Sequence, residues 1–211
     1  MEATAASAAF LEMANPSAPA SDPENDRDIE LMALVGAGNE QAFRLLVERH
    51  QNSVVGTLAR MLGDAAEAED LAQRTFLRVW KHAKRWKPEA KFTTYLFTIA
   101  RNLAYNESRR RSRKKEVSSD QMHDEYGSES AAETRSEPDA EVQRNEMHQE
   151  IDLAIASLPE NQRAAVILFA YESMPYEEIA KVLNTSIPSV KSLIFRGRTT
   201  LREKLAHFTG Y

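Results

Sequence analysis

The sequence predicts an all-α protein of two small helical domains, and three observations carry this expectation. Apolar residues recur at helical spacing through residues 28–115 and again through residues 146–211. Between them, residues 116–145 are rich in Ser and Glu and poor in large apolar side chains, which is typical of a flexible acidic linker. The alternative for the later half of this segment, where AEVQRNEMHQEID favours helix, is a solvated acidic helix. The second domain contains a helix-turn-helix pattern. Residues 1–27, rich in Ala, Ser and Pro, are expected to form a disordered tail.

Composition excludes several classes of function. The 211 residues include no cysteine, which removes disulfides, thiolate catalysis and cysteine-based zinc sites. The five histidines are scattered without metal-ligand spacing, and no set of nucleophile, base and metal ligands marks an enzyme. No apolar run reaches the about 18 residues of a membrane span, and the N-terminus lacks the pattern of a secretory signal. We therefore expect a cytoplasmic, non-enzymatic protein without cofactor, metal or membrane insertion.

Charge is distributed unevenly along the chain. Taken alone, the net charge of −5 argues against a nucleic-acid binder. Residues 101–115, however, hold seven Lys or Arg and one acid, while residues 116–150 hold eleven Asp or Glu and two Arg. Because local charge decides what a surface binds, the better interpretation is a nucleic-acid surface followed by an acidic linker.

The first domain is expected to hold four helices. Apolar periodicity and turn residues place them at residues 28–35, at 40–61, from 64 and from 93. Gly63 separates the second helix from the third, which begins with acids that suit the positive end of a helix dipole. Four helices with short connections predict a compact bundle.

The fourth helix combines aromatic and basic side chains. Phe92, Tyr95 and Phe97 lie in its first turns, and the helix becomes steeply basic from Arg101. Single-stranded nucleic acid requires this combination, since bases stack on aromatics while cations follow the phosphates. The alternative for the basic run is a solvated helix end. Trp86 is expected to anchor the preceding loop, residues 85–91, rather than to stack on a base.

The second domain is expected to resume near Glu146, with a helix at 160–172 followed by a helix-turn-helix. Pro175 suits the start of its first helix, and Ser186 is an N-cap candidate for the second. The second helix has a buried stripe at Val190, Ile194, Leu201 and Leu205. Its exposed face fits a DNA major groove and carries Lys191, Ser192, Arg196, Arg198 and Thr199.

Two sets of motifs, in this order, resemble the bacterial sigma-70 family, and the short chain resembles its small extracytoplasmic-function (ECF) group. DLAQ at 70–73, TFLRVW at 75–80 and TIARN at 98–102 are similar to sigma domain 2. EEIA at 177–180, SVKS at 189–192 and FRGR at 195–198 are similar to sigma domain 4. The resemblance implies a dissociable promoter-specificity subunit of RNA polymerase that is held inactive by an anti-sigma factor.

The resemblance also implies three sets of site residues. Core RNA polymerase would contact Asp70, Leu71, Gln73, Phe76, Leu77 and Trp80. Single-stranded −10 promoter DNA would contact Lys87, Phe92, Tyr95, Arg101, Asn102, Asn106, Arg109 and Arg110. Duplex −35 DNA would contact Ser189, Lys191, Ser192, Phe195, Arg196 and Arg198.

Four positions depart from the family pattern, and two other functions stay open. Arg74 stands where an acid is usual, Tyr95 where Trp is, and Leu193 where Arg is. Gly197 replaces a common Ala and is expected to weaken its helix by about 1 kcal/mol. A duplex-DNA regulator that acts without polymerase would leave residues 70–80 and the aromatic-basic helix unexplained. A helical adaptor would reduce the basic helix to a solvated surface.

Overall fold

The computed structural model describes residues 22–119 and 139–209, which are helical apart from short connections and contain no strand. The N-terminal bundle comprises α2 (Pro23–Gly36), α3 (Glu40–Leu62), α4 (Ala65–His82), the short 3-10 helix η1 (Ala83–Arg85) and α5 (Phe92–Ser119). The C-terminal bundle comprises α6 (Asp139–Ala156), α7 (Glu160–Ala170), α8 (Tyr176–Leu183), α9 (Ile187–Lys204) and α10 (Ala206–Thr209). The predicted all-α class is confirmed.

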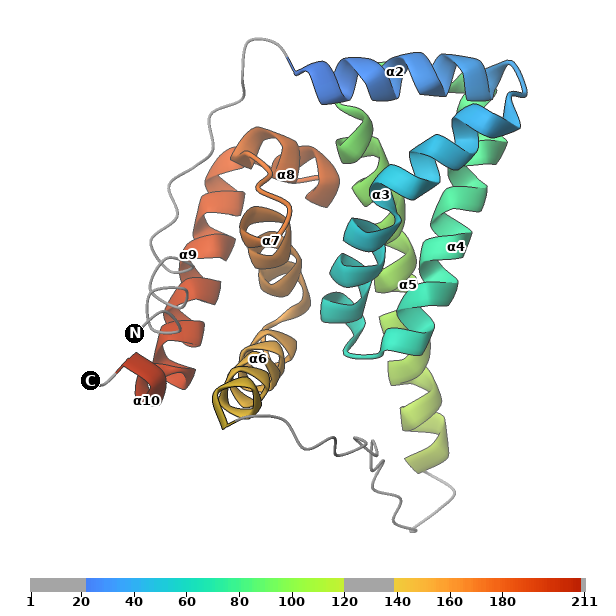
Figure 1. Cartoon of the computed structure of the whole chain (residues 1–211). Coiled ribbons are helices and arrows are strands. Elements are labelled where there is room, and N and C mark those ends of the chain that lie inside the picture. Colours follow the sequence, from blue (N-terminus) through green and yellow to red (C-terminus); the bar gives the residue numbers. More distant parts are fainter. Residues whose placement is uncertain (1–21, 120–138, 210–211) are drawn as a thin grey trace.

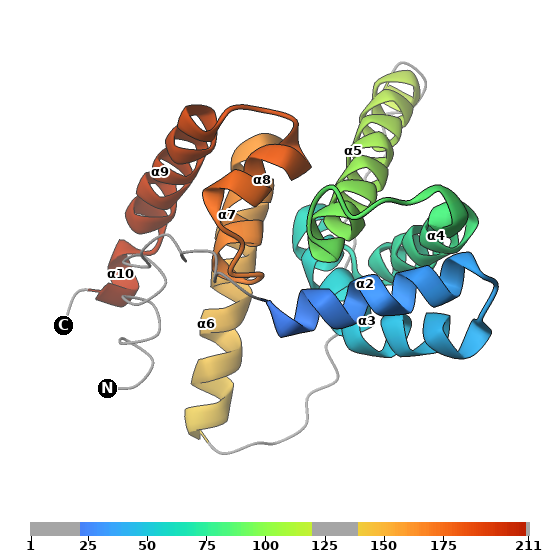
Figure 2. The same cartoon turned by 90° about the horizontal axis from the view of Figure 1, so that it is seen from above.

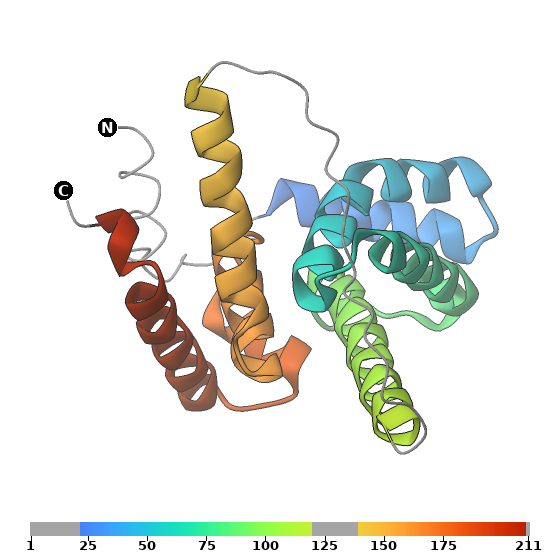
Figure 3. The ribbon, with the colours of Figure 1, turned by 90° about the horizontal axis from the view of Figure 1, so that it is seen from below.

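The two bundles lie side by side. α7 and α8 face the N-terminal bundle, where α8 packs on α5 and α7 on α3 (Figure 1). α9 lies on the opposite, outer side of the C-terminal bundle (Figures 1 and 2). The C-terminal half of α5 projects beyond its neighbours in the bundle (Figures 2 and 3). One side of α9 and the far half of α5 are thus left uncovered by other helices.

The first helix begins earlier than predicted. α2 starts at Pro23, because the Asp22 side chain caps it by accepting a hydrogen bond from the Asn25 backbone N–H at 3.2 Å. Lys91 donates to the same carboxylate at 2.7 Å, and this contact lowers the pKa of Asp22 below its usual range. The expected tail of residues 1–27 is therefore wrong for residues 22–27, and residues 1–21 lie outside the described part of the chain.

Asn25 also connects α2 to the start of α5. Its side-chain oxygen accepts a hydrogen bond from the Phe92 backbone N–H at 2.9 Å. The first N–H groups of a helix have no partner within the helix, so Asn25 satisfies one of them from another element. The start of α5 is consequently fixed by a residue that the sequence pattern placed in a tail.

The expected linker at residues 116–145 is helical at both of its ends. α5 continues to Ser119 and α6 begins at Asp139, so the second domain starts before residue 146. The helix-forming composition of AEVQRNEMHQEID explains the early start of α6. Residues 120–138 of the expected linker lie outside the described residues.

Most local turn predictions are confirmed. Gly63 ends α3 in the left-handed region at φ 69°, and Asp64 caps α4. The Ser186 hydroxyl caps α9 by accepting a hydrogen bond from the Ser189 N–H. All four residues of the predicted stripe of α9 are buried in the core. Pro175 is the residue that precedes α8, one position earlier than the first helical turn.

Gly197 has a role in helix packing that the amino-acid sequence does not reveal. α7 and α9 approach so closely that a Cβ at Gly197 would lie 2.6 Å from the Val166 Cγ2 atom. Both residues are buried in the C-terminal core. The missing side chain therefore permits this helix contact, and the helix-weakening glycine expected from the sequence has a structural reason.

Candidate nucleic-acid interface

The uncovered face of α9 carries the residues expected to contact duplex DNA. Lys191, Ser192 and Arg196 are exposed, and the Phe195 side chain is 72% exposed. The exposed Phe195 ring adds an apolar contact surface to this basic face. Together these side chains give α9 the basic, partly apolar surface that base edges and phosphates in a major groove require.

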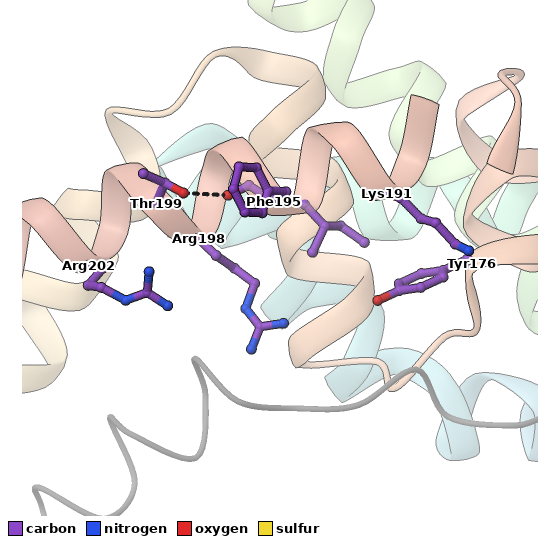
Figure 4. A pocket seen from close by; sticks show the side chains of 7 residues that line it. Tyr176, Lys191, Phe195, Arg198, Thr199 and Arg202 are labelled. Atoms are coloured by element: carbon purple, nitrogen blue, oxygen red, sulfur yellow. Dashed lines mark hydrogen bonds between the residues drawn. The ribbon is translucent and has the colours of Figure 1, made fainter. Parts of the chain in front are cut away.

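A hollow of about 440 Å³ runs along this face. Figure 4 shows that Lys191 points toward Tyr176 in its wall. The Lys191 ammonium lies 5.8 Å from the Tyr176 ring centre, and Arg198 lies 5.8 Å from the buried Phe169 ring. Arg198 is half-buried, while Ser189 is exposed beside the α9 N-cap. The structure adds Tyr176 and Arg202 to this face. Arg202 could have been found from its spacing of four after Arg198.

A second basic surface surrounds the loop before α5. A hollow of about 300 Å³ is lined by Arg78, His82, Arg85, Trp86, Tyr95 and Ile99. The Trp86 and Tyr95 ring centres are 6.1 Å apart, and Trp86 also packs edge-on against Phe92. Trp86 thus anchors the loop as predicted, and it contributes to the wall of the hollow as well.

Of the three aromatics in the first turns of α5, two are buried and one is half-exposed. Phe92 is 0% exposed and Phe97 is also buried, so in this conformation neither ring can stack on a base. The burial of Phe92 corrects the expectation that its ring contacts −10 DNA, since apolar rings at the start of α5 fill the space between α5 and its neighbours. Tyr95 remains half-exposed, and burial raises the pKa of its hydroxyl, which keeps it a neutral hydrogen-bond donor.

The polar and basic residues of α5 divide into two groups. Asn102, Asn106 and Arg109 are exposed, as is Lys87 in the preceding loop. The guanidinium carbons of Arg101 and Arg109 lie 5.1 Å and 5.7 Å from the ring centre of Tyr105, a residue that was not among the expected site residues. Their four-residue spacing places Arg101, Tyr105 and Arg109 on one side of α5, and this spacing is the signal that could have revealed Tyr105.

The remaining arginines form an ionic cluster with the start of α4. Arg110 pairs with the buried Glu107 at 2.6 Å, and Arg111 pairs with Asp64 at 2.9 Å and also with Glu67. Arg110 still exposes two thirds of its side chain, but its charge is shared with a carboxylate. Glu107, expected only as a lone acid in a basic run, is the centre of this cluster.

The helix expected to contact polymerase borders a groove between α3 and α4. Asp70, Gln73 and Leu77 are exposed, and the Leu77 side chain exposes 54% of its surface. Gln73, Phe76 and Leu77 line the groove of about 810 Å³ together with Phe43 and Val47. Apolar side chains at the rim of a groove are typical of a protein-docking surface.

Three of the expected docking residues face inward. Leu71 is 1% exposed and Phe76 is 6% exposed, and Trp80 is half-buried with its ring 5.0 Å from Phe43. Leu71 is enclosed by the core, so it can support a docking surface only from below, whereas Phe76 also lines the groove and Trp80 lies on the α3 side of α4. The unusual Arg74 is exposed and pairs with Asp70 at 3.5 Å. Leu193 of α9, a further departure from the family pattern, is partly buried and packs against the core.

Within residues 22–119 and 139–209, no cluster of His, Cys, Asp or Glu could hold a metal ion. In the same described segments, no helix is both long and apolar enough to cross a membrane.

Comparison with known families identifies both bundles. The profile of Sigma-70 region 2 matches residues 46–114, and that of Sigma-70, region 4 matches residues 148–201. RNA polymerase sigma-H factor of Pseudomonas aeruginosa is 31% identical over 182 residues, which cover 85% of this chain and 94% of that protein. ECF RNA polymerase sigma factor SigW of Bacillus subtilis is 31% identical over 173 residues, covering 81% and 92%.

Solved structures show the same arrangement of helices. CnrH, in complex with the cytosolic domain of CnrY, has a TM-score of 0.64 at 25% identity, over 86% of this chain and 99% of that one. The sigma factor RpoE of Bartonella quintana, in complex with the anti-sigma factor NepR, has a TM-score of 0.61 at 24% identity, over 78% and 96%. With two region profiles in order and relatives that match over most of their length, the chain belongs to the sigma-70 family, in its extracytoplasmic-function group.

Proposed function

We propose that the chain directs RNA polymerase to promoters as a dissociable specificity subunit with no catalysis of its own. The observation that carries this proposal is the presence of two basic surfaces in different bundles. One is the face of α9, which is suited to duplex DNA, and the other is the aromatic hollow beside α5, which is suited to an unpaired base. A cytoplasmic site of action follows from this role.

In the first step, α9 positions the polymerase on the −35 element. Arg196 and Lys191 contact phosphates or base edges, and each good base contact discriminates by about 1–3 kcal/mol. Phe195, exposed on the same face, offers an apolar surface to a thymine methyl group.

In the second step, the N-terminal bundle captures an unpaired base of the −10 element. The hollow between Trp86 and Tyr95 supplies aromatic walls, while Arg78 and Arg85 supply cations for the neighbouring phosphates. Extruding a base costs a few kcal/mol, and stacking returns about 1–3 kcal/mol per base. The net free energy of promoter opening is therefore close to zero, so core polymerase is needed to favour the open state. Asn102 and Arg109 continue this surface along α5.

Core polymerase is proposed to dock on the α3–α4 groove through Asp70, Gln73 and Leu77. An exposed leucine beside polar groups combines apolar burial with the charges that fix orientation. We further propose that an anti-sigma factor competes with core polymerase for binding to this chain. The similarity to CnrH, whose structure is a complex with the cytosolic domain of CnrY, supports a second protein partner.

The decisive experiment is in vitro transcription with core polymerase on a library of random promoters. We expect transcripts that depend on the chain and that share two upstream sequence elements. Transcription that does not depend on the chain would refute the proposal. A duplex-DNA regulator would instead bind one duplex element with full affinity in the absence of polymerase.

The anti-sigma proposal is tested separately by pull-down from the native host, followed by competition with core polymerase. A captured protein that core polymerase displaces supports it. If no partner competes with polymerase, the anti-sigma proposal fails while the promoter role stands.

A further inference from the structure

We propose that a cluster of acids restrains two arginines of α5 and so limits sequence-independent binding of DNA. The acids are Asp64, Glu67 and Glu107, and the arginines are Arg110 and Arg111. The acids thereby raise promoter specificity without contacting DNA. This inference rests on the proposed function and deepens it, because it concerns the α5 surface that is proposed to contact the −10 element.

The start of α4 fixes two of the acids. Asp64 is the N-cap of α4, where its Oδ1 atom accepts a hydrogen bond from the Glu67 backbone N–H at 3.0 Å. Its Oδ2 atom remains available and accepts from Arg111. Asp64 and Glu67 both lie at the N-terminal end of α4, where the helix dipole favours negative charge. The third acid, Glu107, belongs to α5, and its side chain is only 8% exposed.

Each arginine pairs with more than one of these acids. Arg110 donates through Nε to both carboxylate oxygens of Glu107, at 2.8 Å and 2.9 Å, and its Nη2 atom lies 3.8 Å from Glu67. The Nη2 atom of Arg111 lies 2.9 Å from Asp64 and also pairs with Glu67, while its Nε atom lies 4.0 Å from Glu107. Two positive charges thus face three negative ones, so the cluster as a whole offers a phosphate no net attraction.

Two other arginines of α5 are placed differently. Arg109 is exposed beside the Tyr105 ring, and Arg101 donates to the neutral side chains of Asn102 and Asn161. Within residues 22–119 and 139–209, no carboxylate lies at ion-pair distance from the guanidinium group of Arg101 or Arg109. The helix therefore presents unneutralised cations on one side and neutralised cations where it meets the start of α4.

A phosphate that binds Arg110 or Arg111 must displace a carboxylate. When Arg110 leaves, the nearly buried Glu107 carboxylate loses the partner that compensates its desolvation, which is unfavourable. Binding that is independent of sequence comes from phosphate contacts that release counterions, so the restraint on Arg110 and Arg111 weakens this component. Base contacts made elsewhere on the N-terminal bundle are not affected. The acids therefore raise the ratio of specific to non-specific binding.

The test measures how binding of a fluorescein-labelled pool of short random single-stranded DNA by the full chain depends on salt. Glu107→Gln keeps the side-chain shape but removes the charge that restrains Arg110, and Glu67→Gln does the same for Arg111. Each released arginine that reaches a phosphate should steepen the salt slope by about 0.7. Raising the salt from about 50 to about 200 mM should then weaken binding about 2.6-fold more than in the wild type, and about sevenfold more in the double variant.

Glu69→Gln is the matched control, because Glu69 is exposed on α4 outside the cluster and the substitution changes the net charge by the same amount. Its salt slope should remain that of the wild type. Adding Arg110→Ala to Glu107→Gln should return the slope to the wild-type value. Circular dichroism confirms that each variant keeps its helices; if Glu107→Gln does not, the more exposed Glu67→Gln carries the test. Slopes no steeper than that of Glu69→Gln, or a steeper slope that persists without Arg110, would overturn the inference.

The effect on specificity is measured with core polymerase on the library of random promoters. The Glu67→Gln, Glu107→Gln double variant should transcribe from a broader set of −10 sequences than the wild type, because the sequence-independent part of its binding is stronger. An unchanged set of −10 sequences would also overturn the inference. Transcription by the wild-type chain tests the proposed function independently, because it persists if only the inference is wrong.

Discussion

Replacing Gly197 by alanine is expected to destabilise the protein, although the same change in an ordinary helix stabilises it. Alanine in a helix interior is favoured over glycine by about 1 kcal/mol. At Gly197 the new methyl group would lie 2.6 Å from Val166 Cγ2, and Val166 is buried with a stiff, β-branched side chain. Overpacking of this kind costs about 1–3 kcal/mol, so the net loss of unfolding free energy is about 0–2 kcal/mol.

Gly56→Ala in α3 is the matched control. A Cβ at Gly56 would meet only the end of the flexible Arg60 side chain, at 3.1 Å, so the helix-forming gain of about 1 kcal/mol should remain. Urea unfolding followed by circular dichroism measures both variants. The two substitutions should therefore differ by the overpacking cost of about 1–3 kcal/mol.

Adding Val166→Ala identifies the atom responsible. This second substitution removes the Cγ2 atom that the new methyl group would meet, so Gly197→Ala should cost less in the Val166→Ala background than in the wild-type chain. The reasoning is refuted if Gly197→Ala stabilises the protein as much as Gly56→Ala does, or if the effects of the two C-terminal substitutions simply add.

Three further changes test the proposed surfaces. Gln73→Arg should abolish co-purification with core polymerase while leaving the helix content unchanged; retained binding would place docking elsewhere. If the Arg196 side chain reaches a base, Arg196→Ala should alter the sequence preference at one −35 position. If it contacts phosphate, the substitution should reduce the salt slope of binding by about one unit. No effect on promoter use would indicate that α9 is not part of the DNA interface. Asn102→Ala should slow opening of duplex promoters, and a template with a pre-melted −10 bubble should recover part of the rate; equal defects on both templates would indicate base recognition alone.

The sequence predicts the helices well because their signals are local. Gly63, Asp64 and Ser186 act within a few residues, and their turns and caps form where the sequence places them. The burial of Phe92 and the α7 contact of Gly197 depend instead on neighbouring helices, which periodicity along one helix does not describe.

The same limit applies to the candidate site. The basic face of α9 follows from its own periodicity, so Lys191 and Arg196 could be predicted. The aromatic hollow combines α4, η1 and α5, and only the structure brings Arg78 and His82 to it. Arg101 donates a hydrogen bond to the side chain of Asn161, which is sixty positions away in the chain. No local sequence pattern signals such a contact.

Because Asn25 caps α5, residues that precede the matched family region help to hold the loop that leads into this helix. The loop at residues 85–91 is held at one end by Trp86 and at the other by the Asp22 and Asn25 contacts to Lys91 and the Phe92 N–H. The matched Sigma-70 region 2 begins only at residue 46. A shortened chain that began at Asp28 would keep every matched residue, yet it would release one end of this loop. The segment ahead of the family region thereby holds in place one end of the loop that we propose captures an unpaired base.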